Sequence, residues 1–196
     1  MIIYFFIFLI CIFLLHYYHE RMNFYKVVLV ESPIDNKKYL VRDLVDKKDS
    51  ADLLANINKN IKTLNDYLFK NKEKYPNYIK YIEQLNEKLK NTKIQESTDN
   101  GVYTSYSVNK GEQIIFCLRS RKKGSEGKLH DLNLLMYVVI HEMGHVACPE
   151  FGHTDLFKDI FAFLATEAVK LKIYEKIDFN EKNQEYCGLT ITDSII

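Results

Sequence analysis

The apolar positions of this 196-residue chain begin with an uncharged block and then form short periodic segments. Residues 1–15 carry no charge, and the run extends to Tyr18 before Glu20 and Arg21. At 1.5 Å per residue, a helix of about 18–20 residues nearly spans a hydrocarbon core of ~30 Å. A cleaved signal peptide fits less well, because no cation precedes the run and no small-residue cleavage site follows it. We therefore expect an uncleaved transmembrane anchor over residues 1–20.

Residues 21–100 predict an N-terminal subregion that begins with a β-hairpin. Residues 25–31 and 38–42 are rich in β-branched side chains, and turn-forming residues from Ser32 to Lys37 separate them. This pattern is typical of two antiparallel strands.

Two amphipathic helices are expected after this hairpin. Apolar residues recur at spacings of three and four from Leu53 to Leu68, which predicts one helix with Ser50 as its N-cap. Pro76 interrupts the pattern, and a second helix follows it. We expect the two helices to pack antiparallel on a core, and residues 92–101 to form a polar connector.

Residues 101–196 predict a second unit with its own hairpin and helices. Residues 102–108 and 113–118 read as two strands around a turn. An almost wholly apolar helix should begin after the N-cap Asp131 and end before Pro149.

The end of the chain adds one more helix and a strand. Thr154 and Asp155 can open a helix that runs to about Lys172, and residues 186–192 could supply a last strand. Together these elements predict an α+β fold with an N-terminal transmembrane helix and a helical-hairpin subregion.

The candidate chemistry is concentrated at the end of the apolar helix, in the HExxH sequence that starts at His141. His141 and His145 are one helical turn apart, so both imidazoles can reach one metal ion. Glu142 lies about 100° around the helix, close enough to act on a metal-bound water without being a ligand. Two histidines have no packing role in such an apolar helix, which favours a zinc site over a pair of core histidines.

A catalytic zinc site needs a third protein ligand and one open position. His153 is the preferred candidate, because Pro149 ends the helix and allows the chain to turn back. Glu167, on the next predicted helix, is the alternative ligand. His130 is expected at the surface or as a capping residue.

Charge and cysteine content indicate which partners and which cellular compartment to expect. Lys and Arg number 27 and Asp and Glu number 26, so we expect no nucleic-acid partner attracted by bulk charge. Cys11 lies in the apolar run, and Cys117, Cys148 and Cys187 show no regular spacing, so a disulfide framework is not expected and a reducing compartment fits better. Cys148 is expected to be a free buried thiol.

The cations Arg21 and Lys26 favour a cytoplasmic location for the remainder of the chain.

Three segments occur in an order that resembles the WLM and SprT-like zinc metallopeptidases, which have a zincin-like fold. They are a strand ending in Leu-x-Arg, the HExxH helix and a Gly-His-x-x-x-aromatic element, at residues 114–121, 134–145 and 152–157. The resemblance implies that His141, His145 and His153 bind Zn²⁺ and that Glu142 is catalytic. The spacing from His145 to His153 departs from the usual WLM pattern. The whole chain also resembles predicted membrane-anchored metallopeptidases of large DNA viruses, in which segments like residues 39–44, 104–112 and 186–193 recur. This resemblance implies a viral or virion membrane.

The sequence thus predicts a membrane-anchored zinc metallopeptidase that acts on a protein or peptide. Residues 113–118 could be the edge strand that aligns the substrate, and Tyr186 or Arg119 could stabilise an oxyanion. Two alternatives remain: a non-catalytic membrane or virion protein with structural zinc, and a zinc hydrolase acting on another type of bond.

Overall fold

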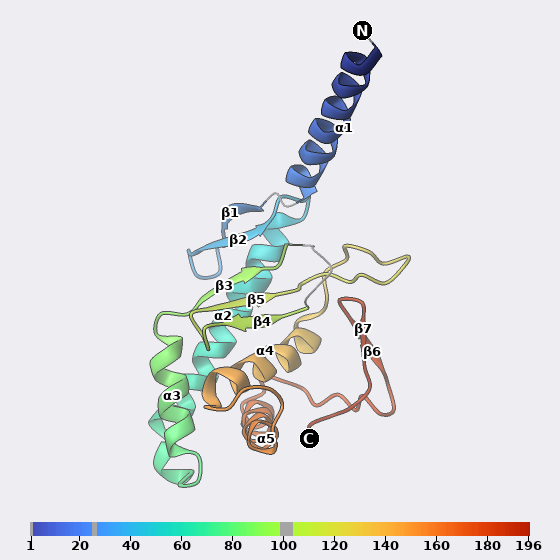
Figure 1. Cartoon of the computed structure of the whole chain (residues 1–196). Helices are drawn as coiled ribbons and strands as arrows, with labels where there is room; N and C mark the ends of the chain where they lie inside the picture. Colours follow the sequence, from blue (N-terminus) through green and yellow to red (C-terminus); the bar gives the residue numbers. More distant parts are fainter. Residues whose placement is uncertain (1, 25–26, 99–103) are drawn as a thin grey trace.

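The computed structural model describes residues 2–24, 27–98 and 104–196. These residues form five α-helices, one 3₁₀ helix and seven strands in small sheets, so the predicted α+β class is confirmed (Figure 1). The first residues of two predicted strands, 25–26 and 102–103, lie outside the described residues.

The first helix, α1 (Ile2–Phe24), projects away from the rest of the chain (Figure 1). The prediction of a transmembrane anchor is wrong: among the described residues, no helix has the length and apolar character needed to span a bilayer. The continuous apolar part of α1 is residues 2–15, and His16 begins a more polar part of the same helix that reaches Glu20 and Arg21. About 14 residues rise only roughly 21 Å, which is short of a ~30 Å hydrocarbon core.

The predicted N-terminal hairpin is present. Strands β1 (Val27–Glu31) and β2 (Lys38–Arg42) are antiparallel, with Val27 opposite Arg42. In β2, Tyr39 and Val41 are buried and belong to the hydrophobic core.

The two expected amphipathic helices are α2 (Lys47–Lys70) and α3 (Ile79–Leu89), and a 3₁₀ turn, η1 (Lys72–Lys74), lies between them. The predicted N-cap was wrong, because α2 begins one turn earlier, after Asp46. Ser50 is buried instead, and its hydroxyl accepts a hydrogen bond from Nη2 of Arg119 at 2.6 Å.

A three-stranded sheet lies between the helices, in the order β3 (Lys93–Glu96), β5 (Gln113–Phe116), β4 (Tyr106–Val108). The β4–β5 hairpin was predicted, but β3 falls in the segment expected to be a connector. Because β3 pairs parallel with β5, β5 is the central strand, and the prediction that it forms the substrate-aligning edge is wrong. The two edges of this sheet are β3 and β4, and β4 is the edge that lines the cleft.

Two helices carry the candidate site, α4 (Leu132–Ala147) and α5 (Asp155–Lys170). Both predicted N-caps are confirmed, since Asp131 accepts a hydrogen bond from the N–H of Leu134 and Thr154 accepts one from the N–H of Phe157. Most of α4 is buried between the sheet, α3 and α5 (Figure 1).

The C-terminal segment forms a hairpin of β6 (Gln184–Tyr186) and β7 (Leu189–Ile191) rather than one strand. Cys187 and Gly188 form its turn, with φ of 51° and 87°, as the tight two-residue turns of hairpins require. A disulfide joins Cys187 to Cys117, just beyond β5, so the expectation of unpaired cysteines is wrong for these two. The sequence could not reveal this pairing, because the partners are 70 residues apart and meet only when the hairpin folds back. Cys148 is a free buried thiol, as expected.

Candidate metal centre

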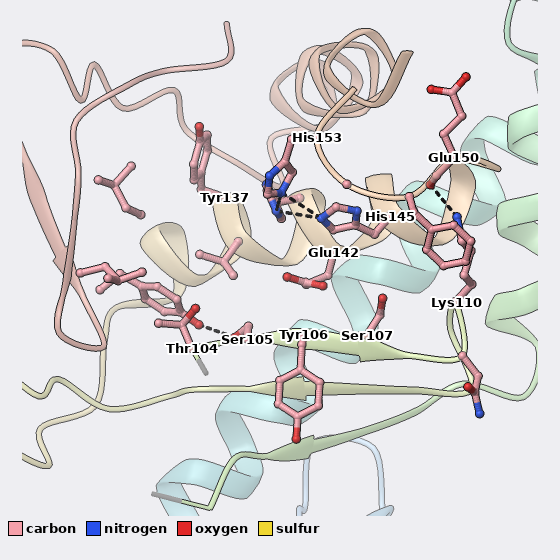
Figure 2. A pocket seen from close by; sticks show the side chains of 18 residues that line it. Thr104, Ser105, Tyr106, Ser107, Lys110, Tyr137, Glu142, His145, Glu150 and His153 are labelled. Atoms are coloured by element: carbon pink, nitrogen blue, oxygen red, sulfur yellow. Dashed lines mark hydrogen bonds between the residues drawn. The ribbon is translucent and has the colours of Figure 1, made fainter. Parts of the chain in front are cut away.

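Three histidines meet at one point above the central sheet. The Nε2 atoms of His141, His145 and His153 are each 3.1 Å from the other two. His141 and His145 come from the last turns of α4, and His153 comes from the loop that leads to α5 (Figure 2). The structure therefore brings together the three residues that the sequence singled out.

This triangle of nitrogen atoms fits a shared cation. In a neutral imidazole, Nε2 either donates or accepts one hydrogen bond, so three mutual contacts cannot all be hydrogen bonds. Ligands about 2.0–2.1 Å from a tetrahedral zinc ion lie roughly 3.3 Å from each other, close to the spacing seen here. Among the described residues, this is the group of His, Cys, Asp and Glu side chains that could hold a metal ion.

The surroundings keep the two helical histidines neutral. Burial lowers the pKa of His141 to about 3, and the neighbouring His145 and His153 act in the same direction. Burial also lowers the pKa of His145 to about 4, with contributions from His153 and from the ammonium of Lys110. Neutral imidazole is the form that binds a metal ion.

Aromatic side chains of α5 hold the histidine rings from behind. Phe157 stacks on His145 with ring centroids 4.2 Å apart, and it meets His141 edge-on at 5.0 Å. This close packing depends on Gly144, since a Cβ at that position would lie 3.1 Å from the Phe157 ring. The glycine within the HExxH sequence is thus explained by helix packing.

Glu142 lies on the same helix and points toward β4 (Figure 2). It is only 4% exposed, and burial raises the pKa of its carboxyl group to about 7, against the opposing effect of a hydrogen bond from the backbone N–H of Ser107. A carboxyl group with a pKa near neutrality can both take up and release a proton.

The histidines and Glu142 open onto a cleft of about 780 Å³. One wall is β4 with the following turn, and another is the β6–β7 hairpin. The cleft is lined by Tyr137, Val138, Tyr186, Leu189 and Ile191 among apolar side chains, and by Asn109, Lys110 and Glu150 among polar ones.

Glu167, the alternative third ligand, lies elsewhere. Its carboxylate is buried on α5, where it accepts a hydrogen bond from the Tyr75 hydroxyl at 2.7 Å and pairs with Lys170 at 2.6 Å. Glu167 therefore joins α5 to the residue that follows η1, and it is not part of the histidine cluster.

The other residues considered from the sequence, Tyr186, Arg119 and His130, do not belong to the histidine cluster. Tyr186 lines the cleft, but its hydroxyl donates to the carbonyl oxygen of Cys117 at 3.0 Å and contacts the Ser105 hydroxyl. Arg119 lies outside the cleft, in a buried ion pair with Glu96. His130 is half-buried rather than at the surface, and its Nε2 accepts a hydrogen bond from the N–H of Cys187 at 3.3 Å.

Sequence reasoning missed two residues of this site, Ser107 and Lys110. Both belong to the β4–β5 hairpin, whose residues carry no motif that predicts a place beside the histidines. They reach the cleft only because β4 pairs with β5 on the side of β5 that is opposite β3.

The fold and the histidine geometry define an α+β protein with a candidate metal site on an HExxH helix. The chain belongs to the family of Uncharacterized protein R325 of Acanthamoeba polyphaga mimivirus: the two are 47% identical over 167 residues, which is 85% of this chain and 83% of that protein. It is also similar to Uncharacterized protein 136R of Invertebrate iridescent virus 6, with 39% identity over 83 residues, 42% of this chain and 44% of the relative. A third relative, Uncharacterized protein 042R of Invertebrate iridescent virus 3, is 36% identical over 110 residues, 55% of this chain and 62% of that protein. No family model and no solved structure matches the chain.

Proposed function

We propose that this protein is a zinc-dependent metallopeptidase of the WLM/SprT-like type. The observation that carries the proposal is the triangle of Nε2 atoms, 3.1 Å on each side, with the buried carboxylate of Glu142 beside it in an open cleft. His141, His145 and His153 would hold the ion. A zinc ion held there would supply a Lewis acid that polarises a scissile carbonyl and lowers the pKa of a coordinated water.

Glu142 is the group of this chain that would move the proton. Its carboxylate is buried beside the histidines at the cleft, where it could accept a proton from the attacking water. The resulting carboxylic acid can then pass that proton to the departing amine. Ser107 of β4 lines the same cleft as Glu142 (Figure 2).

The outer edge of β4 is suited to bind an extended peptide. In an antiparallel pair, successive residues alternate between facing the partner strand and facing away from it. In β4, which is an edge strand of its sheet and lines the cleft at Tyr106 and Ser107, groups that face away from β5 could pair with an extended substrate. Main-chain pairing of this kind recognises an extended segment with little dependence on its sequence.

A purely structural zinc site is less well supported. Structural sites have four protein ligands, whereas three ligand side chains converge in the part of the chain that the structure describes. A structural site also has no need for a buried carboxylate or for a cleft of about 780 Å³.

The test is cleavage of a peptide library by the full chain with zinc, read by mass spectrometry. Glu142→Gln should retain one zinc per chain and lose about 100-fold or more of the rate, since a positioned acid–base group contributes on that scale. Glu87→Gln, a change of the same type at an exposed position of α3 that does not line the cleft, should leave the rate unchanged. Full activity of the Glu142→Gln variant, or no cleavage by the zinc-loaded wild-type protein, would contradict the proposal.

A further inference from the structure

The loop that carries His153 needs a support of its own. Helix α4 ends at Ala147, and the chain passes through Pro149 and the exposed Phe151 before it reaches His153, eight residues after His145. His141 and His145 are held by the regular helix, but His153 lies in irregular backbone. Its position therefore depends on what fixes the preceding residues.

The side chain of Lys110 contacts this loop at four places. Its Nζ donates hydrogen bonds to three consecutive carbonyl oxygens, those of Cys148 at 2.9 Å, Pro149 at 3.0 Å and Glu150 at 2.6 Å. The same ammonium lies 4.2 Å from the ring centroid of Phe151. An ammonium group has three N–H donors, so the three carbonyls use all of them.

Lys110 reaches the loop from a different part of the fold. It comes from the turn between β4 and β5, and Figure 2 shows it extending from that turn to the Glu150 backbone. A cation at this place also interacts favourably with the C-terminal end of α4, where backbone carbonyls lack helical partners. The side chain thus joins the cleft-lining hairpin to the end of the metal-binding helix.

We propose that Lys110 is a positioning residue that fixes the 148–151 loop and thereby holds His153 against His141 and His145. This inference rests on the metal site of the proposed function. Lys110 is not one of the three candidate ligands, and it would support the site through the backbone that leads to His153.

The test measures zinc affinity, by competition with a chromophoric chelator, in the full chain. Lys110→Met keeps the length of the side chain but removes the charge and the donors, and it should weaken zinc binding by about 10–100-fold, the usual loss when the support of a ligand is removed. Lys110→Arg keeps the charge and the donors and should recover most of that affinity. Lys158→Met is the matched control, because Lys158 is exposed and pairs only locally with Asp155 on α5.

A double variant separates positioning from general stability. If Lys110 acts through His153, Lys110→Met should no longer weaken zinc binding in a His153→Ala background, where loss of the ammonium near His145 can only favour the cation. An equal loss in both backgrounds, or no loss in the single variant, would overturn the proposal.

If Lys110→Met fails to fold, Phe151→Leu takes its place, since Phe151 is 85% exposed and its change should loosen the loop without unfolding the core. A Phe151→Leu effect of at least about 3-fold that vanishes in the His153→Ala background would support the same conclusion, and an unchanged affinity would overturn it.

The readout also keeps this inference separate from the peptidase proposal. A chain that binds zinc as described but cleaves no peptide would refute the activity and leave the role of Lys110 intact. If His153→Ala binds zinc as tightly as the wild-type protein, the ligand assignment fails, and the role of Lys110 fails with it.

Discussion

Nε of Arg119 lies 2.7 Å from Oε1 of Glu96, and the two side chains are only 4% and 1% exposed. The second carboxylate oxygen of Glu96 accepts a hydrogen bond from the backbone N–H of Arg42 at 2.8 Å. The other guanidinium nitrogens of Arg119 contact Asp46 and Ser50 at the start of α2. One buried cation therefore joins the end of the central sheet to the N-terminal hairpin and to α2.

Removal of this cation should destabilise the protein strongly. We expect Arg119→Met to lower the free energy of unfolding by about 3–5 kcal/mol, because Glu96 would remain buried without its partner. The double variant Glu96→Gln/Arg119→Met should lose less than the sum of the two single changes. Urea unfolding measures both, and a loss below about 1 kcal/mol for Arg119→Met would show that Glu96 finds another partner.

The contact between Arg119 and Asp46 predicts sensitivity to acid. The hydrogen bond and charge of Arg119 hold the pKa of Asp46 below its usual value of 3.8, although partial burial opposes them. A group with a lowered folded-state pKa contributes stability above its unfolded pKa and loses it as the pH falls through the folded value. Asp46→Asn should therefore lose less stability than the wild-type protein between pH 6 and pH 3, as urea midpoints would show. Asp49→Asn, an exposed change on the same helix, should follow the wild-type curve.

The disulfide should stabilise the fold and shape the cleft. It closes a segment of 70 residues, for which the chain-entropy model gives about 4 kcal/mol. Cys117→Ala/Cys187→Ala should lower the free energy of unfolding by roughly that amount, whereas Cys11→Ala should not. Because the β6–β7 hairpin lines the cleft, the double variant should also raise KM for a peptide substrate while zinc content stays unchanged. A lost zinc site would contradict the second expectation.

The packing of α4 on α5 makes Gly144 sensitive to the smallest addition. In Gly144→Ala the new methyl group would meet the Phe157 ring at 3.1 Å, so we expect a loss of about 1–3 kcal/mol in stability. Zinc affinity should fall as well, because Phe157 stacks on His145. The added change Phe157→Leu should restore part of both, since it removes the ring atoms that clash. If Phe157→Leu worsens the Gly144→Ala defect, the explanation by packing is wrong.

Local patterns predicted much of this molecule. The hairpin of β1 and β2, the amphipathic helices α2 and α3, and the N-caps Asp131 and Thr154 follow from side-chain periodicity and from short-range hydrogen bonding. Local patterns failed where a distant partner decides the outcome. The segment of β3 is too short and polar to be recognised without its partner β5. Ser50 was predicted to be an N-cap, but its hydroxyl accepts a hydrogen bond from Arg119 instead.

At the apolar start of the chain, amino-acid composition alone led to a wrong prediction of a membrane span. Its lack of charge suggested a membrane span, yet the apolar stretch is about 14 residues and ends at Leu15 within a longer helix. The predicted span of about 18–20 residues counted His16, Tyr17 and Tyr18 as part of the apolar stretch.

The sequence by itself determined the candidate ligands, because an i, i+4 spacing on a helix necessarily places His141 and His145 on one face with Glu142 beside them. Tertiary structure alone brought His153 into the cluster and buried Glu167 against Tyr75. It also placed Ser107 and Lys110 at the cleft. The physical reason is that helix periodicity is a property of neighbours along the chain, whereas strand order and loop anchoring depend on contacts between residues far apart in sequence.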